Sequence, residues 1–498
     1  MSGERLDRRT LGVTALTMAG VAIAAGTPTV IGVTGAGTPL WTALAWAVPA
    51  GLLLVGVSVL ADLLRWRGTR YLVTGDRLEV TFSLVVHSRK TLARERIRSV
   101  DLTASPVHRA LGVAVLTIGT GRHESGTQGR VKLDPLARAD AERLRAELLS
   151  HAEAPEHGAG EATLAKLDWS WLRYAPVSFA APALGVAAFG AVLQASDWFG
   201  LQKGLLHWVY EFFRGLPLVL MIAVLLAAAV VVGAVGALGL FTEAWWGFRL
   251  DREPGGTLRV RRGLLTTRSI TIEERRLRGV DVVEPIGNRL TGAARVDAVA
   301  TGLRQQEDDD KTGYRTLQPA APLAEAERVA AAVLGEPVAP TAAARLLPHP
   351  VAARGRRLRW WLLAALLPVL VLVVLGLVLA DVLLVIAAVF AVVAVPAAVL
   401  LGLDAYRSLG HGVTGRYLVT RSDAMRRSTV ALERAGVLGW TVKQSVFQRR
   451  RGLATFTATT AAGTGAYSIR DAAAGEGLEF ASAAVPGVLA PFVVGGRP

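Results

Sequence analysis

One stretch of the sequence returns twice further along the chain, and this repetition constrains the architecture more than any other feature. The first copy runs from Thr91 to Gly112 and the second from Thr271 to Gly292, while a looser third copy runs from Val437 to Gly452. In each copy an arginine stands 12 positions after an apolar residue, and a glycine stands three positions after the arginine. The three sets are Ile97, Arg109 and Gly112; Leu277, Arg289 and Gly292; and Val437, Arg449 and Gly452. Such self-similarity predicts three copies of one module, which we call repeats one, two and three.

A shared pentapeptide supports the repetition. RYLVT stands at Arg70–Thr74, upstream of the core of repeat one, and again at Arg416–Thr420, upstream of repeat three. The distance from its tyrosine to the first apolar residue of the triplet is 26 residues in repeat one and 20 in repeat three. Repeat two has Gly247-Phe248-Arg249-Leu250 in its place, so the match is weaker there.

Long uncharged runs precede each repeat. A composition with 52% hydrophobic residues favours a membrane protein, and a helix of about 20 apolar residues crosses the hydrocarbon core. A cleaved signal peptide at the N-terminus is the weaker alternative, because a second apolar run follows at once. Six spans in three hairpins are predicted: Leu11–Val33 with Leu40–Leu60, Tyr174–Ser196 with Gly215–Thr242, and Trp360–Ala380 with Val382–Leu403.

Each repeat reads as a small antiparallel β unit that is closed by a helix. In repeat one, short β-rich runs are predicted at Arg77–Phe82, Leu84–Leu92, Ile97–Leu102, Val113–Ile118 and Val131–Leu133. Asp134 and Pro135 are predicted to cap a helix over Leu136–Leu149. The corresponding helix of repeat two is predicted at Leu323–Leu334, directly after Pro322.

The basic residues give the predicted orientation. The turns inside the hairpins carry no net positive charge, whereas the opposite ends of the spans are rich in arginine, for example Arg65, Arg67 and Arg354. Because positive flanks favour the cytoplasmic side, both termini and all three β units are expected in the cytoplasm, with the protein in the cell (inner) membrane. These flanks also account for the net charge of +15 without nucleic acid as a partner.

With these repeats established, the chain resembles the bacterial PH-like membrane family, whose members combine transmembrane hairpins with several β modules. The resemblance rests on RYLVTGDRLEV at Arg70–Val80, on TLARERIRSVDL from Thr91, and on RALG at Arg109–Gly112. It implies a PH-like fold for each module, a strongly bent sheet with a C-terminal helix. The predicted domains are hairpins at 1–63, 172–243 and 358–404, and PH-like modules at 64–151, 244–336 and 405–485.

The residues offer no catalytic or metal site. The chain has no cysteine, which excludes thiolate ligands and cysteine nucleophiles. The glycines from Gly119 to Gly129 lack the phosphate-loop ending, His87, His108 and His123 lack metal spacing, and the acidic run Glu307–Asp310 is typical of a solvated loop. We therefore expect no enzyme and no cofactor.

Arginines in matching places of two repeats are the candidate contact residues. Arg94, Arg96 and Arg98 alternate in repeat one, which places them on one face of an extended segment. Arg275, Arg276 and Arg278 hold the matching place in repeat two. They suit anionic headgroups or an acidic partner, and the alternative is a solvated edge that discourages strand pairing.

The expected function is therefore non-enzymatic. The chain is predicted to present three cytoplasmic PH-like modules for protein or lipid-headgroup binding, in envelope maintenance or protection. The alternative is a transporter or lipid-handling channel component, which the uncharged spans disfavour. Expected partners are membrane lipids and, because members of the family are often accompanied by one, a smaller single-module membrane companion; a homo-oligomer is the other candidate assembly.

Overall fold

The computed structural model describes residues 4–74, 77–83, 87–93, 97, 99–119, 130–149, 162–177, 180–198, 201–301 and 315–488. These residues form two compact units, Met1–Glu274 and Arg275–Pro498. Repeat two contributes to both units, because the boundary falls between the two halves of its β strands. Each unit is described by itself.

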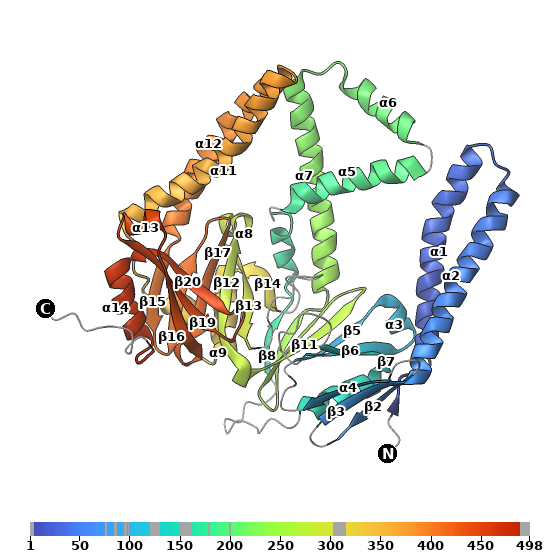
Figure 1. Ribbon diagram of the computed structural model, residues 1–498, viewed down its shortest axis with the longest axis horizontal. Helices are drawn as coiled ribbons and strands as arrows, with labels where there is room; N and C mark the ends of the chain where they lie inside the picture. The colour runs from blue at the N-terminus through green and yellow to red at the C-terminus, as the bar shows by residue number, and fades with distance from the viewer. Residues whose placement is uncertain are drawn as a thin grey trace. The chain divides into compact units, whose positions relative to one another are not determined.

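Five helices in the described part of the chain are long and apolar enough to cross a membrane. They are α1 (Thr10–Gly35), α2 (Leu40–Gly68), α7 (Leu218–Trp245), α11 (Val351–Val378) and α12 (Val382–Arg407). In Figure 1, α1 and α2 lie side by side as a hairpin, and so do α11 and α12. The third predicted span corresponds to α5 (Ala180–Trp198), whose apolar part, Ala183–Asp197, is shorter than these five; α6 (Gln202–Phe213) follows it.

The first unit contains two antiparallel sheets. Sheet order is β1-β2-β3-β4 in one and β7-β6-β5-β11-β10-β9-β8 in the other. Their strands are β1 (Glu4–Arg5), β2 (Thr69–Val73), β3 (Arg77–Ser83), β4 (His87–Ala93), β5 (Ser99–Ala104), β6 (Val113–Gly119), β7 (Arg130–Ala137), β8 (Ala162–Lys166), β9 (Arg249–Glu253), β10 (Thr257–Arg262) and β11 (Thr267–Glu273). The second sheet therefore joins the last three strands of repeat one, β5 to β7, to the four strands β8 to β11 that follow in the chain.

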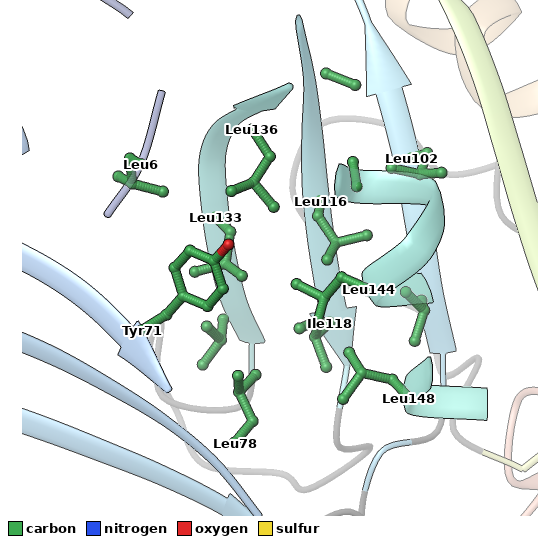
Figure 2. Packing of buried hydrophobic residues seen from close by; sticks show 14 of the residues in the cluster. Leu6, Tyr71, Leu78, Leu102, Leu116, Ile118, Leu133, Leu136, Leu144 and Leu148 are labelled. Carbon is green, nitrogen blue, oxygen red and sulfur yellow. The ribbon is translucent and has the colours of Figure 1, made fainter. Parts of the chain in front are cut away.

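The core of this unit lies between the strands of repeat one and helix α4 (Arg138–Leu149) (Figure 2). Ala141, Leu144 and Leu148 recur at helical spacing and are buried against Leu116 and its neighbours. Leu6 and Trp66, at the ends of α1 and α2, join the same cluster, and the Trp66 indole N–H donates to the Leu6 carbonyl at 2.7 Å. The first hairpin is thereby fixed to its β strands.

The second unit repeats this arrangement. Its sheets have the orders β14-β13-β12-β17-β16-β15 and β18-β19-β20. The strands are β12 (Leu277–Pro285), β13 (Ala293–Ala300), β14 (Thr316–Pro322), β15 (Gly410–Thr414), β16 (Tyr417–Ser422), β17 (Arg426–Glu433), β18 (Val437–Lys443), β19 (Leu453–Thr460) and β20 (Ala466–Ala473). Helix α9 (Leu323–Leu334) buries its apolar face, and α14 (Ala474–Ala484) packs beside Phe456. A sheet is again shared by consecutive repeats.

The chain segments before and after each group of apolar helices pair with each other. β1, directly before α1, pairs with β2, directly after α2. β8, before α5, pairs with β9, after α7. Leu347, before α11, forms an isolated bridge with His411, after α12. In each case the chain leaves a sheet, passes through the helices and returns to the strand beside its point of departure.

The three glycines found in the sequence occupy equivalent turns. Gly112, Gly292 and Gly452 have φ of 69°, 71° and 65°, a region that is costly for residues with a Cβ. Each follows a short helix, respectively α3 (Pro106–Ala110), α8 (Ile286–Leu290) and α13 (Val446–Arg449). Each glycine carbonyl accepts a hydrogen bond from the first residue of the closing helix, at 3.1, 2.9 and 2.9 Å. The glycine thus links the turn to the helix in all three places.

Two sequence expectations are wrong. Asp134 and Pro135 do not cap a helix: β7 runs on to Ala137, paired with β6, and α4 begins at Arg138. The two RYLVT copies are also not equivalent, since the first lies in β2, the first strand after its hairpin, and the second in β16, the second strand after its hairpin. This shift of one strand explains why their distances to the core differ.

Candidate functional site: a charged cavity beside a membrane helix

A cavity of about 480 Å³ opens in the second unit, between strands β12, β13, β16 and β17 and strand β20. Arg357 and Trp361, in the early turns of α11, also line it. The charged residues that line it are Asp281, Asp297, Asp423, Arg315, Arg357, Arg426 and Arg470. The volume is in the range of small-molecule sites, and the lining places cations and carboxylates together.

Two aspartates face each other at the base of this cavity. Asp281 of β12 and Asp297 of β13 are direct partners in the ladder, and each is at least nine-tenths buried. Burial, and then the neighbouring Asp297 carboxylate, raise the pKa of Asp281 to about 6, although Ser428 donates a hydrogen bond to it at 2.6 Å. Because Asp297 is paired with Arg295 at 2.9 Å, Asp281 is the carboxyl that changes charge near neutral pH.

Polar atoms in the cavity wall are left without a partner. Among the described residues, one carboxylate oxygen of Asp297 and the Nε of Arg315 are buried with no hydrogen-bond partner. Buried polar groups are nearly always satisfied. A carboxylate oxygen calls for a donor and a guanidinium N–H for an acceptor, so the cavity suits a ligand that carries both.

The neighbouring helix is fixed to the β strands through a buried carboxylate. Asp471, which is 0% exposed, forms ion pairs with Arg356 and, at 2.8 Å, with Arg357. It also accepts a hydrogen bond from Gln448 at 2.8 Å and has a φ of 61°. The wall that α11 supplies to the cavity is therefore held in place by charge-assisted bonds.

A second charged cluster, in the first unit, is held together by ion pairs between its own side chains. Arg145 of α4 and Arg259 of β10 both bind Glu253 of β9, at 3.2 and 3.1 Å, and Arg259 also binds Glu142 at 2.9 Å. Burial raises the pKa of Glu253, but the hydrogen bonds and charges of the two arginines outweigh it and lower that pKa overall. This cluster connects the closing helix of repeat one to strands of repeat two.

The structure describes three of the six arginines that the sequence suggested as contact residues. Arg94, Arg96 and Arg98 lie outside the described residues. Arg275 and Arg276 belong to the short 3-10 helix η4 (Glu274–Arg276), and Arg278 lies in β12, paired with Glu433 of β17 at 2.9 Å. None of the three lines the cavity. The glycine loop beyond Gly119, His123 and Glu307–Asp310 also lie outside the described residues.

Sequence reasoning missed the cavity, although one signal was present. Asp281 stands in the run Val280-Asp281-Val282-Val283, where a charge interrupts a buried strand. Repeat one has Asp101 at the matching position, and that residue is buried too. A carboxylate in a doubly buried strand is rare unless it is paired or functional.

Comparison with known proteins gives one match. A family model described as Bacterial PH domain matches residues 15–152 and 363–485, together more than half of the chain. No curated protein matches the chain, and no solved structure matches it either.

Proposed function

Since the chain belongs to the bacterial PH domain family, we propose that it is a non-enzymatic, multi-pass membrane protein that holds a phospholipid headgroup in the cavity of its second unit. Six spans in three hairpins place its PH-like modules at the cytoplasmic face of the cell membrane. A role in envelope maintenance, and a complex with a smaller single-module companion, belong to the same proposal.

The strand pairing beside each hairpin supports six spans rather than five. β8 and β9 lie side by side in one sheet, on either side of α5, α6 and α7. If α7 crosses the membrane, the chain has to cross once more to return to that sheet. Helix α5 is the apolar segment between them, so we assign the remaining span to it.

The observation that carries the binding proposal is the pair of orphaned buried groups beside α11. Basic residues in the first turns of a membrane helix lie at the level of the headgroups, and Arg357 and Trp361 of α11 line the cavity. The arginines of the cavity suit a phosphate. Among them, Arg315 has an N–H that is free to donate to it. The unpaired oxygen of Asp297 suits a hydroxyl or ammonium donor on the same headgroup.

The test compares headgroups that differ in their donors. Full-length protein is placed in nanodiscs, and retained lipids are counted by native mass spectrometry. Phosphatidylglycerol and phosphatidylethanolamine, which carry donors, are expected to be retained about tenfold more than phosphatidylcholine, which has none. Arg315→Gln should abolish the preference, while Arg328→Gln, the same change in an exposed ion pair on α9, should not.

Equal retention of the three lipids would refute the headgroup assignment.

The arginines that the sequence singled out carry a separate proposal. We propose that they add general attraction to anionic lipid; they are Arg94, Arg96, Arg98, Arg275, Arg276 and Arg278. Charge reversal at the first three should then weaken vesicle binding in a salt-dependent way and leave insertion unchanged.

A further inference from the structure

We propose that copies of this chain associate head to tail, by pairing of strand β18 in one copy with strand β4 in the next. The proposal rests on the sheets that consecutive repeats share within the chain. It does not depend on the lipid-binding proposal, because none of the residues involved lines the cavity.

The two junctions inside the chain use the same strands in the same register. β5 of repeat one pairs antiparallel with β11 of repeat two, and β12 of repeat two pairs with β17 of repeat three. Leu102, five residues after Ile97, faces Ser269, eight residues before Leu277. Val282, five residues after Leu277, faces Thr429, eight residues before Val437. The junction is therefore a property of the repeat.

Repeats one and three each leave one half of this junction open. In the described part of the chain, β18 ends its sheet and nothing pairs with its outer edge, and the same holds for β4. β18 is the counterpart of β5 and β12, and β4 is the counterpart of β11 and β17. Each inner junction pairs a repeat with the next one along the chain, and repeat three has no following repeat in this sequence, so we assign its partner to a second copy.

A glycine in β18 leaves space for the close approach of a partner strand. A Cβ on Gly279 would lie 1.9 Å from the Ala431 carbonyl oxygen, so β17 can approach β12 only because this residue is glycine. Gly439 holds the matching position in β18, and nothing described lies within 4 Å of its Cβ position. Repeat one has Ser99 at this position, and there β5 pairs with β11 only from Leu102 onward, so the glycine goes with the longer junction, in which the strands pair from Gly279 itself.

The side chains at the two open edges differ from those at the inner junction, and they differ in the same way on both edges. At the inner junction Arg278 is paired with Glu433 at 2.9 Å. The matching positions hold Leu438 in β18, which is 69% exposed, and Ala93 in β4. An ion pair is thus replaced by an apolar pair on both sides, and the exposed Val442 and Phe447 extend the apolar surface beside this edge.

The arginine that precedes each repeat glycine gives a third observation. Arg109 donates to the Leu264 carbonyl in the turn before β11, and Arg289 donates at 3.3 Å to the Ala424 carbonyl in the turn before β17. Both contacts reach the next repeat across a junction. Arg449 is the third member of the set, and among the described residues its side chain makes no matching contact, as expected of a residue whose partner belongs to another copy.

The shared register specifies the contact. Val442 should face Arg89 of the second copy, and Thr441 should face its Lys90, as Asp281 faces Val430 in the chain. The interface is heterologous, so the copies form a ring if the rotation closes and a filament if it does not.

Disulfide trapping tests this directly, because the chain has no cysteine of its own. Thr441→Cys and Lys90→Cys chains, carrying tags of different size, are purified separately in detergent, mixed and oxidised. Directly opposed strand residues have Cα atoms about 4.5–5.5 Å apart, a distance that a disulfide spans. We expect a mixed dimer at least tenfold more abundant than with Glu479→Cys, on an exposed part of α14, in place of Thr441→Cys.

A second variant separates assembly from folding. Gly439→Ala should leave the melting temperature unchanged and reduce the mixed dimer at least tenfold, whereas Gly475→Ala, which also has nothing within 4 Å, should reduce neither. The proposal is overturned by absence of the mixed dimer, by Thr441→Cys chains linking only to each other, or by a double variant that forms its disulfide within one chain. Each of these results would assign the open edges another partner.

Discussion

Asp281 is the residue whose protonation the fold controls most clearly. Its pKa is raised from the ordinary value of 3.8 to about 6, chiefly by burial and then by Asp297. A carboxyl whose pKa is raised on folding contributes stability that is complete at pH values below its unfolded pKa and is lost as the pH rises through the folded value. At pH 7.5 the charged side chain therefore costs roughly 3 kcal/mol.

We predict that Asp281→Asn removes this cost. The variant and the parent should have equal stability near pH 4, and the variant should be more stable at pH 7.5, with most of the difference developing between pH 4 and 6.5. Thermal unfolding in detergent across this range is the measurement. Asp423→Asn, an exposed change of the same kind at the cavity rim, is the control. A difference that does not vary with pH would contradict the assignment.

Asp471 is the second residue with a large expected effect. Removing one partner of a buried ion pair leaves the other charges uncompensated and typically costs about 3–5 kcal/mol. Asp471→Ala should therefore destabilise the second unit by this amount, since Arg356, Arg357 and Gln448 all lose their acceptor.

An exposed ion pair nearby supplies the control for Asp471. Arg470→Ala breaks only the pair with Asp423, in which both side chains are more than two-fifths exposed, and such pairs contribute about 0–1 kcal/mol. Proteolysis of the second unit under graded denaturant can compare the two variants. Equal effects would mean that Asp471 does not anchor α11.

Residue identity alone predicted some of these features. The offsets of Gly112, Gly292 and Gly452 identified three equivalent turns, because a left-handed turn requires glycine wherever it recurs. The cavity could not be predicted in the same way, since Asp281, Arg315 and Arg357 come from segments far apart in the chain. Only the charge in the buried β12 run pointed to it.

At the scale of elements, the shared sheets matter most, and Gly279 tests them. Gly279→Ala places a methyl group 1.9 Å from the Ala431 carbonyl oxygen, so β12 and β17 have to separate. We expect a loss of about 3 kcal/mol or more, at the upper end of the range for overpacking. Gly439→Ala at the matching open position should cost little in the monomer. Equal costs, measured by unfolding in detergent, would contradict the close approach of β17.

The strands themselves were predictable from their β-branched and apolar runs, but their pairing across repeats was not. The inter-strand bonds join backbone groups, which carry no sequence signal, and the choice of partner depends on which edges the fold brings together. Asp134-Pro135 shows the same limit: the local pattern favours a helix start, whereas pairing with β6 extends β7 through both residues.

At the scale of the whole molecule, hydropathy predicted the long apolar helices and the repeats located the β units between them. Among the described residues, five helices meet the length and composition needed to cross a membrane, and α5 falls short. The pairing of β1 with β2, of β8 with β9 and of Leu347 with His411 is the information that the sequence lacked. It ties together the chain segments on either side of each group of helices, and this supports our proposal of an even number of crossings.

The most direct test of this account is cysteine accessibility in intact cells, which needs no background correction because the chain has no cysteine. A membrane-impermeant maleimide is applied to single-cysteine variants before and after permeabilisation. We predict that intact cells are labelled at the turns between the spans, in Ala36→Cys, Lys203→Cys and Asp381→Cys. Labelling only after permeabilisation is predicted in the closing helices α4, α9 and α14, for Ala146→Cys, Ala324→Cys and Glu476→Cys. Labelling of any closing helix in intact cells, or protection of Lys203→Cys there, would contradict six spans with all modules on the cytoplasmic face.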